Sequence, residues 1–186
     1  MSTKIELLSE AEALIRSHGY AAFSYADLSK KIGIRKASIH HHFPTKEDLG
    51  LSVVDNYLVK FRARLEEIAT RSTNTLDRLR DYAELFIEAT QNHHLPLCGA
   101  LAVDRNSMPA SLQGRTRDFF ELHVEWLTGV MADGIREGAV RADLSAKGAA
   151  LMVLSNLEGA SLVALAMNDR EIVAESVKAL MITINS

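Results

Sequence analysis

The sequence predicts an all-α protein, and three observations support this fold class. Apolar residues recur at spacings of three and four along most of the 186-residue chain, which is the period of an amphipathic helix. No segment shows a β-strand pattern of comparable quality, and only three prolines interrupt the chain. The hydrophobic content of 47% and the charged content of 24% are typical of a globular protein. The length suits one large or two small domains with a buried core.

Capping residues delimit the first two predicted helices. The first carries its apolar face at Leu7, Leu8, Ala11, Leu14 and Ile15. Gly19 follows this face, as expected just past a helix C-terminus. Ser24 predicts an N-cap, with Asp27 three residues later in an approximate capping box. The second helix then runs from Tyr25 to about Ile32 and stops at Gly33.

A third short helix is predicted over about residues 35–43, because Pro44 disfavours helical geometry in the residue before it. Residues 28–46 hold five basic residues, three consecutive histidines and no acid, in a chain of net charge −3. Residues 1–50 hold seven Lys/Arg against six Asp/Glu, whereas the remaining 136 hold fourteen against eighteen. Two short helices around a glycine-containing turn predict a helix-turn-helix, which presents its second helix to the DNA major groove. The alternative is a solvated basic hairpin of helices.

Longer helices are predicted after residue 45. Thr45 caps the first of them, which runs towards Ala69, and two acidic residues follow at the positive end of its dipole. Pro109 opens a long aromatic helix that runs to about Gly138, after a shorter helical segment. The other predicted helices contain residues 79–87, span residues 145–167 and span about residues 170–184.

Several classes of protein and site are excluded by composition. A single cysteine, Cys98, leaves no internal disulfide and no cysteine-rich zinc site. Adjacent side chains on a helix diverge by about 100°, so neither residues 40–42 nor the pair His93 and His94 has metal-motif spacing. We expect no metal and no cofactor. No run approaches the roughly 18 apolar residues of a membrane helix, and the N-terminus lacks a signal-peptide core. We therefore expect a cytoplasmic protein without membrane contact.

The third helix is the candidate for reading DNA. Ile39 and Phe43, four residues apart, define its buried side. Its N-terminal part would approach base edges, where Lys36 donates to guanine and Ser38 to bases or a phosphate. Phosphate contacts, which position a protein without specifying sequence, are predicted from side chains and from the N-terminus of the second helix. The candidate DNA-binding residues are Ser24, Tyr25, Lys36, Ala37, Ser38, His40, His41 and Lys46.

The first fifty residues resemble the N-terminal domain of the TetR family of transcriptional regulators. The stretches that carry the resemblance are Gly19-Tyr20, Phe23-Ser24, residues 28–34, residues 36–39 and residues 42–49. It is specific over about residues 4–52. The resemblance implies nine helices: a three-helix DNA-binding domain at residues 1–46, and a six-helix effector-binding and dimerisation domain at residues 47–186.

The resemblance also implies a function. We expect a ligand-responsive regulator, a repressor, that binds a palindromic operator as a homodimer and is released by a small-molecule effector. Such a dimer places two recognition helices about one DNA turn, roughly 34–36 Å, apart. In the family the last two helices form the dimer interface, and residues 145–167 are rich in the small side chains that allow close packing. An effector bound between helices four to eight would tilt helix four and change the separation of the two DNA-binding domains of the dimer.

One position departs from the family pattern. The family usually has tyrosine where His40 stands, and uses it on the DNA backbone. Because histidine changes charge near physiological pH, we expect DNA affinity to weaken from mildly acidic to mildly basic pH. Ser29 replaces a more usual alanine at a tight helix contact and is small enough to be tolerated.

A second set of residues is the candidate effector site. An apolar cavity with a few polar groups suits a small molecule, and the alternative for each aromatic member is an ordinary core position. Cys98 is either a small buried hydrophobe or a thiol that senses electrophiles, activated by His93 or His94. The candidate effector-binding residues are Tyr82, Phe86, His94, Cys98, Leu101, His123, Trp126, Leu127, Val153 and Asn156.

Two other functions compete with the regulator. A thiol or histidine enzyme would need a base and an oxyanion site near Cys98, and the sequence shows no third member of such a set. We therefore expect no enzymatic activity. A helical small-molecule-binding or scaffold protein without DNA binding is the other alternative, and salt-dependent, sequence-specific DNA binding would exclude it.

Overall fold

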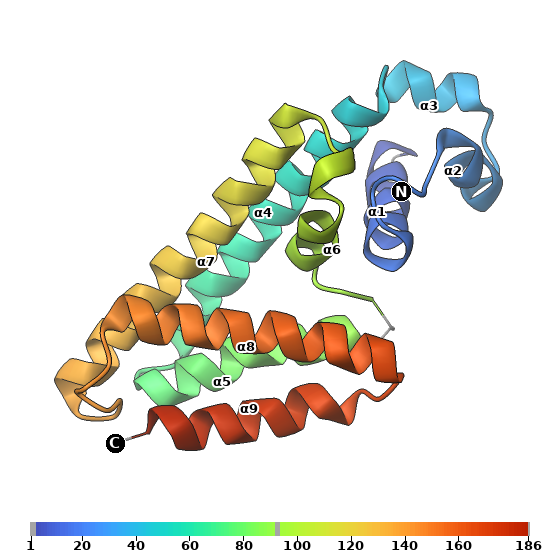
Figure 1. Cartoon of the computed structure of the whole chain (residues 1–186). Coiled ribbons are helices and arrows are strands. Elements are labelled where there is room, and N and C mark those ends of the chain that lie inside the picture. Colours follow the sequence, from blue (N-terminus) through green and yellow to red (C-terminus); the bar gives the residue numbers. More distant parts are fainter. Residues whose placement is uncertain (1–2, 92–93, 186) are drawn as a thin grey trace. The chain divides into compact units, whose positions relative to one another are not determined.

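The computed structural model describes residues 3–91 and 94–185. Over these residues the all-α prediction is confirmed, since the only β-type pairing is an isolated antiparallel bridge between Val140 and Asn185. The predicted helix positions are correct to within a few residues. The described helices are α1 (Thr3–His18), α2 (Tyr25–Ile32), α3 (Lys36–His42), α4 (Lys46–Arg71), α5 (Thr75–Thr90), α6 (Leu97–Val103), the 3₁₀ turn η1 (Arg105–Ser107), α7 (Ala110–Glu137), α8 (Ala146–Met167) and α9 (Glu171–Ile184), as labelled in Figure 1.

The chain divides into two compact units. The first comprises Met1–Phe61 and Leu97–Phe119, and the second comprises Arg62–Pro96 and Phe120–Ser186. The N-terminal parts of α4 and α7 belong to the first unit, and their C-terminal parts belong to the second. The predicted boundary at residue 46 separates a DNA-binding domain from an effector-binding domain. It divides the chain by function, whereas the two units divide it by packing, so the boundary stays a prediction.

The first unit is built on α1. Leu7, Ala11 and Ile15 are fully buried along one face of this helix, and α1 packs against α2 and α6. In the same unit Phe61 and Phe119 meet edge to face with ring centroids 5.4 Å apart. Leu8 and Leu14, the other predicted apolar positions of α1, are half-buried.

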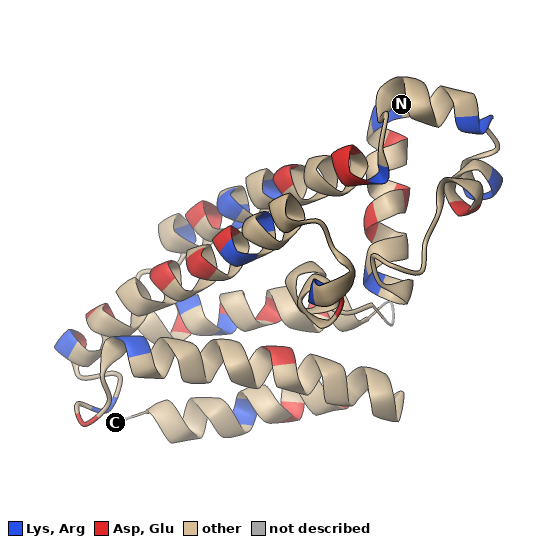
Figure 2. Cartoon of the chain, turned by 45° about the horizontal axis from the view of Figure 1, so that its top comes forward, with Lys and Arg blue, Asp and Glu red and all other residues tan. Residues whose placement is uncertain are grey.

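The second unit is built around α5, α8 and α9, which pack against one another. Figure 2 shows how few charges α8 carries, and in its sequence these are Lys147 and Glu158. By length and a mean hydropathy of 1.6, α8 would qualify as a membrane-crossing helix. Its buried face, with Val153 and Leu157, lies against α5 and α9, so it is a core helix of this unit.

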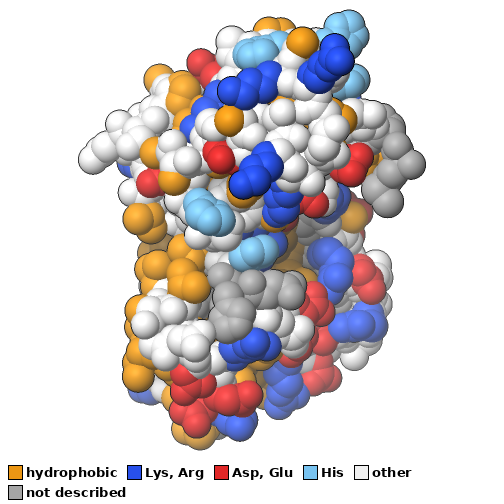
Figure 3. Space-filling view, turned by 90° about the vertical axis from the view of Figure 1, so that its right-hand side faces the viewer, with side chains coloured by type: hydrophobic (Ala, Val, Ile, Leu, Met, Phe, Trp, Pro, Cys, Tyr) orange, Lys and Arg blue, Asp and Glu red, His pale blue; other side chains and the backbone are white. Residues whose placement is uncertain are grey.

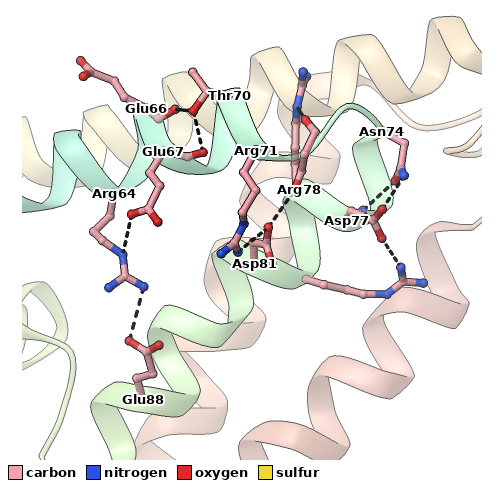
Figure 4. Close-up of polar contacts among 12 residues, drawn as sticks. Arg64, Glu66, Glu67, Thr70, Arg71, Asn74, Asp77, Arg78, Asp81 and Glu88 are labelled. Carbon is pink, nitrogen blue, oxygen red and sulfur yellow. Dashed lines mark hydrogen bonds and ion pairs between the residues drawn. The ribbon is translucent and has the colours of Figure 1, made fainter.

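A polar network joins the C-terminal end of α4 to α5 within the second unit (Figure 4). Arg71 pairs with Asp81 at 2.8 Å, and the Ser72 hydroxyl donates to the same carboxylate at 2.7 Å. Arg78 donates to the Ser72 carbonyl at 2.9 Å, and Arg64 pairs with Glu88 at 3.6 Å. The end of α4 is thus fixed to α5 by side chains as well as by the short turn between them.

Candidate nucleic-acid interface and effector site

The start of α2 is held by the predicted capping box. The Ser24 hydroxyl accepts a hydrogen bond from the Ala26 N–H, and the Asp27 carboxylate accepts 2.7 Å bonds from the Ser24 N–H and hydroxyl. These bonds lower the pKa of Asp27. At the other end Gly33 adopts φ +77°, the left-handed geometry that a side chain disfavours. The turn between α2 and α3 is therefore fixed by local chemistry.

Tyr25 connects α2 to the segment that follows α3. Its phenol donates to the carbonyls of Phe43, at 2.9 Å, and Thr45, at 2.5 Å. Burial, with help from the Asp48 carboxylate, raises the pKa of Tyr25 to about 12. Because the side chain is buried and its hydroxyl is engaged within the protein, only the backbone of Tyr25 remains for the predicted phosphate contact at the start of α2.

Helix α3 presents the predicted face. Ile39 is fully buried and Phe43 is 2% exposed, as the spacing predicted. The predicted reading residues Lys36, Ala37 and Ser38 are exposed, as are His40 and His41. At the top of Figure 3, blue Lys/Arg and pale-blue histidine side chains gather on the surface of the first unit.

A shallow hollow of about 470 Å³ lies on this surface. Three of its lining residues are candidate DNA-binding residues, and the sequence interpretation left out the other three. Of these, Thr3 comes from α1 and Ile34 from the turn before α3. The lining residues are Thr3, Ile34, Ala37, Ser38, His41 and His42. Only tertiary contact between the start of α1 and α3 brings them together, so no spacing along the chain could have identified the set.

His40 is oriented by a contact with Pro44, two residues beyond the end of α3. Its Nδ1 lies 3.1 Å from the Pro44 carbonyl oxygen, and its ring meets the Tyr25 ring edge to face with centroids 4.8 Å apart. The imidazole is therefore held in one orientation at an exposed position.

Lys46 occupies an unexpected place. Its ammonium lies 4.7 Å and 4.5 Å from the ring centroids of Tyr20 and Phe23, and it donates to the Ala21 carbonyl at 3.3 Å. The N–H of Ala21 in turn donates to the Asp104 carboxylate at 3.1 Å. Burial lowers the pKa of Lys46, and nearby carboxylates partly oppose this. In this structure Lys46 therefore fixes the connection between α1 and α2, and it would have to turn outward to anchor a phosphate.

Several predicted effector residues meet in the second unit. Tyr82 Oη and His123 Nδ1 lie 2.5 Å apart, and both side chains are buried. The half-buried Trp126 stacks on Tyr82 with centroids 5.3 Å apart, and Phe86 meets Tyr82 at 5.5 Å. Burial lowers the pKa of His123 to about 3, so this histidine is neutral at physiological pH. The cluster offers aromatic surface and uncharged polar groups.

The other predicted effector residues are more dispersed. In the second unit Leu127 and Val153 are buried, and Asn156 accepts a 3.0 Å bond from the Ser176 hydroxyl. His94 lines a small hollow with residues of α5, α8 and the turn before α9. Cys98 and Leu101 belong to the first unit and are buried on α6, at 1% and 0% exposure.

Burial of Cys98 favours its interpretation as a small hydrophobe, because a reactive thiol needs exposure. The predicted partner His93 lies outside the described residues. Over the residues that the structure describes, no group of three or more His, Cys, Asp or Glu side chains is arranged to hold a metal ion.

Comparisons with known proteins agree with this arrangement. Residues 7–53 match the family model of bacterial regulatory proteins of the tetR family. The HTH-type transcriptional repressor KstR2 of Mycobacterium tuberculosis is 28% identical over 149 residues, which cover 77% of this chain and 72% of the repressor.

Two of the solved structures that cover the whole chain show the family most clearly. A TetR transcriptional regulator from Legionella pneumophila is 34% identical with a TM-score of 0.89, and the match covers 98% of that protein. A TetR-family transcriptional regulator from Agrobacterium tumefaciens is 31% identical with a TM-score of 0.95, again over 98% of its length. The chain therefore belongs to the TetR family and is a ligand-responsive, DNA-binding transcriptional regulator.

Proposed function

We propose that the protein is a cytoplasmic repressor that binds a palindromic operator as a homodimer and releases it when a small molecule binds. The exposed face of α3 supports this proposal most directly. It carries a cation, a methyl group and a hydroxyl at Lys36, Ala37 and Ser38, with no acidic residue on the helix. These groups match base edges in the major groove, where lysine donates to guanine and a methyl group contacts thymine. His41 and His40 would contact the flanking phosphates, together with the backbone N–H groups that begin α2.

The first test is footprinting on DNA that flanks the protein's own gene. Protection of a two-fold symmetric site would support the proposal, and uniform weak protection would favour a ligand-binding protein without operator recognition. Lys36→Ala should relax discrimination at one base pair in each half-site by about 1–3 kcal/mol. Lys60→Ala, an exposed lysine on α4, is the matched control and should leave the sequence preference unchanged.

Homodimerisation through α8 and α9 is the second part of the proposal. These helices expose large apolar side chains, namely Leu151, Leu162, Val163, Leu165, Met167 and Ile182. Self-association of such a face buries apolar surface at about 25 cal/mol per Å². Leu162→Glu should produce monomers in analytical ultracentrifugation. Val59→Glu, at a 70% exposed apolar position on α4, should stay dimeric, and a dimeric Leu162→Glu protein would contradict the assignment.

The effector is proposed to bind at the aromatic cluster of Tyr82, Phe86, His123 and Trp126. Since these side chains supply aromatic surface and a neutral hydrogen-bonding pair, they favour an uncharged, largely apolar molecule. Trp126 is the only tryptophan, so its emission reports directly on this cluster. Uncharged aromatic compounds that change this emission should also release the operator. Release by compounds that leave Trp126 unchanged would place the effector elsewhere.

Val153, Leu127, Asn156 and His94 are proposed as further effector-binding residues of the second unit. Leu101 and Cys98, which belong to the first unit, are proposed separately as effector-responsive positions of that unit. A sensing role for Cys98 is tested by Cys98→Ser. If an electrophile acts through this thiol, the substitution should abolish electrophile-induced loss of DNA binding. A response that persists in Cys98→Ser would leave the thiol as a packing residue.

A further inference from the structure

The bond between His40 and Pro44 fixes which ring nitrogen of His40 carries the proton. A carbonyl oxygen only accepts hydrogen bonds, so the 3.1 Å contact requires Nδ1 of His40 to be the donor. In the neutral imidazole the other nitrogen, Nε2, is then an acceptor without a proton. The side chain is exposed, and Nε2 is the ring nitrogen left for an outside partner.

A phosphate diester oxygen is also an acceptor only. The neutral His40 ring therefore has nothing to donate to a DNA phosphate while it keeps its bond to Pro44. The imidazolium form donates from both nitrogens, so it can hold Pro44 through Nδ1 and a phosphate through Nε2. A hydrogen bond from a charged donor to phosphate is also stronger than a neutral one.

We propose that operator binding draws one proton onto His40 of each subunit, so that DNA affinity is linked to pH through this single side chain. This inference rests on the proposed function, because it requires α3 to lie against operator DNA. It deepens that function by naming the protonation state in which the site binds.

Titratable groups lie near His40 on α2 and on α3 itself. From α2 it faces the Tyr25 phenol, whose pKa of about 12 keeps it neutral at physiological pH. At the start of α4 the Asp48 carboxylate accepts bonds from the N–H and hydroxyl of Thr45. On α3 itself the neighbouring titratable groups are His41 and His42, whose rings meet edge to face at 5.5 Å. Among the described residues no ion pair to His40 is found.

The sign of the effect follows from linkage. The DNA complex holds the added proton and the free protein does not, so affinity falls as pH rises. An imidazole changes charge between about pH 5 and pH 8. If each complexed His40 must be protonated, raising the pH from about 6.5 to about 8 should weaken binding about tenfold for each subunit.

The experiment measures binding of the full-length protein to the footprinted duplex at fixed ionic strength across this pH range. Fluorescence anisotropy gives the affinity. Calorimetry in phosphate and in Tris, buffers with different ionisation enthalpies, gives the number of protons taken up. For the unchanged protein we expect uptake approaching one proton per subunit near pH 8, where free imidazole is mostly neutral.

His40→Gln and His18→Gln form the matched pair of variants. The glutamine amide donates at every pH, so His40→Gln should bind with a nearly flat pH profile and little proton uptake. His18→Gln, at an exposed position of α1 outside the candidate DNA-binding residues, should keep the profile of the unchanged protein. A flat profile in the unchanged protein, or a slope that survives His40→Gln, would overturn the inference while leaving operator binding intact. Absence of any site-specific binding at every pH would instead overturn the proposed function, and this inference with it.

Discussion

The DNA-binding segment, residues 24–46, and the buried aromatic cluster of Tyr82, Phe86, His123 and Trp126 organise polar chemistry in opposite ways. In the segment the candidate functional groups other than Tyr25 and Lys46 are exposed. The bonds that shape it are mostly local, such as Ser24 to Asp27 and His40 to Pro44. In the cluster, Tyr82 and His123 are buried and lie 41 positions apart in the chain. The first region is readable from short sequence patterns, whereas the second exists only after the helices have packed.

This difference predicts which substitutions change DNA binding and which change the stability of the fold. Substitutions of exposed groups on capped helices should change DNA binding with little effect on the free energy of unfolding, because water already solvates these groups. Buried polar groups couple to folding, because their desolvation must be offset by partners within the protein. Four predictions test this contrast, in order of decreasing effect.

Ile39→Ala should have the largest effect, because even the DNA-binding segment depends on the tertiary core at its buried positions. Ile39 is fully buried, and removing such a side chain costs about 2–5 kcal/mol of unfolding free energy. Urea unfolding followed by circular dichroism measures the loss. His41→Ala, at an exposed position of the same helix, should stay within about 0.5 kcal/mol of the unchanged protein. Equal stabilities for the two variants would contradict the packing described for α3.

Acidification should destabilise the protein through His123. The folded pKa is lowered to about 3, so below the ordinary value of about 6.5 the unfolded chain binds a proton that the folded chain does not. The contribution of neutral His123 to the free energy of unfolding is present above about pH 6.5 and is lost as the pH falls towards 3. The expected loss is about 2 kcal/mol between pH 6.5 and pH 5.

Unfolding of His123→Gln at the same two pH values provides the comparison. This variant should show a much smaller difference between them, whatever its absolute stability. An undiminished acid sensitivity would mean that other groups cause it.

Tyr25→Phe should cost about 1–2 kcal/mol, because it leaves the buried Phe43 carbonyl without the phenol donor and also removes the bond to Thr45. The ring packing is retained, so the change isolates the hydroxyl. Hydrogen exchange of the α3 amides should accelerate more than that of the α9 amides. Uniform acceleration in both helices would contradict a local role for the phenol.

Ser24→Ala should have the smallest effect, about 1 kcal/mol, since it removes one helix cap at an exposed site. Thermal unfolding measures it. Ser17→Ala is the control, because the Ser17 hydroxyl bonds only within α1 and is exposed. A loss as large as that of Tyr25→Phe would show that the cap does more than begin α2.

The sequence predicted the cap at Ser24, the turn at Gly33 and the burial of Ile39 and Phe43, and the structure confirms each of them. It also placed the long helices to within a few residues. Neither the contact of Lys46 with the rings of Tyr20 and Phe23 nor the bond from Ala21 to Asp104, 83 positions away, could be predicted.

The sequence by itself therefore determined the helices, their ends and the face that α3 presents, because these depend on residues within about one turn of each other. Only the tertiary structure decided which polar groups are buried together, as with Tyr82 and His123. It also decided which residues predicted to contact DNA are already engaged within the protein, as with Tyr25 and Lys46. The physical reason is that pairing and desolvation depend on side chains brought together from distant positions. Helical periodicity gives the direction of a side chain from its own helix but not the partner that it meets.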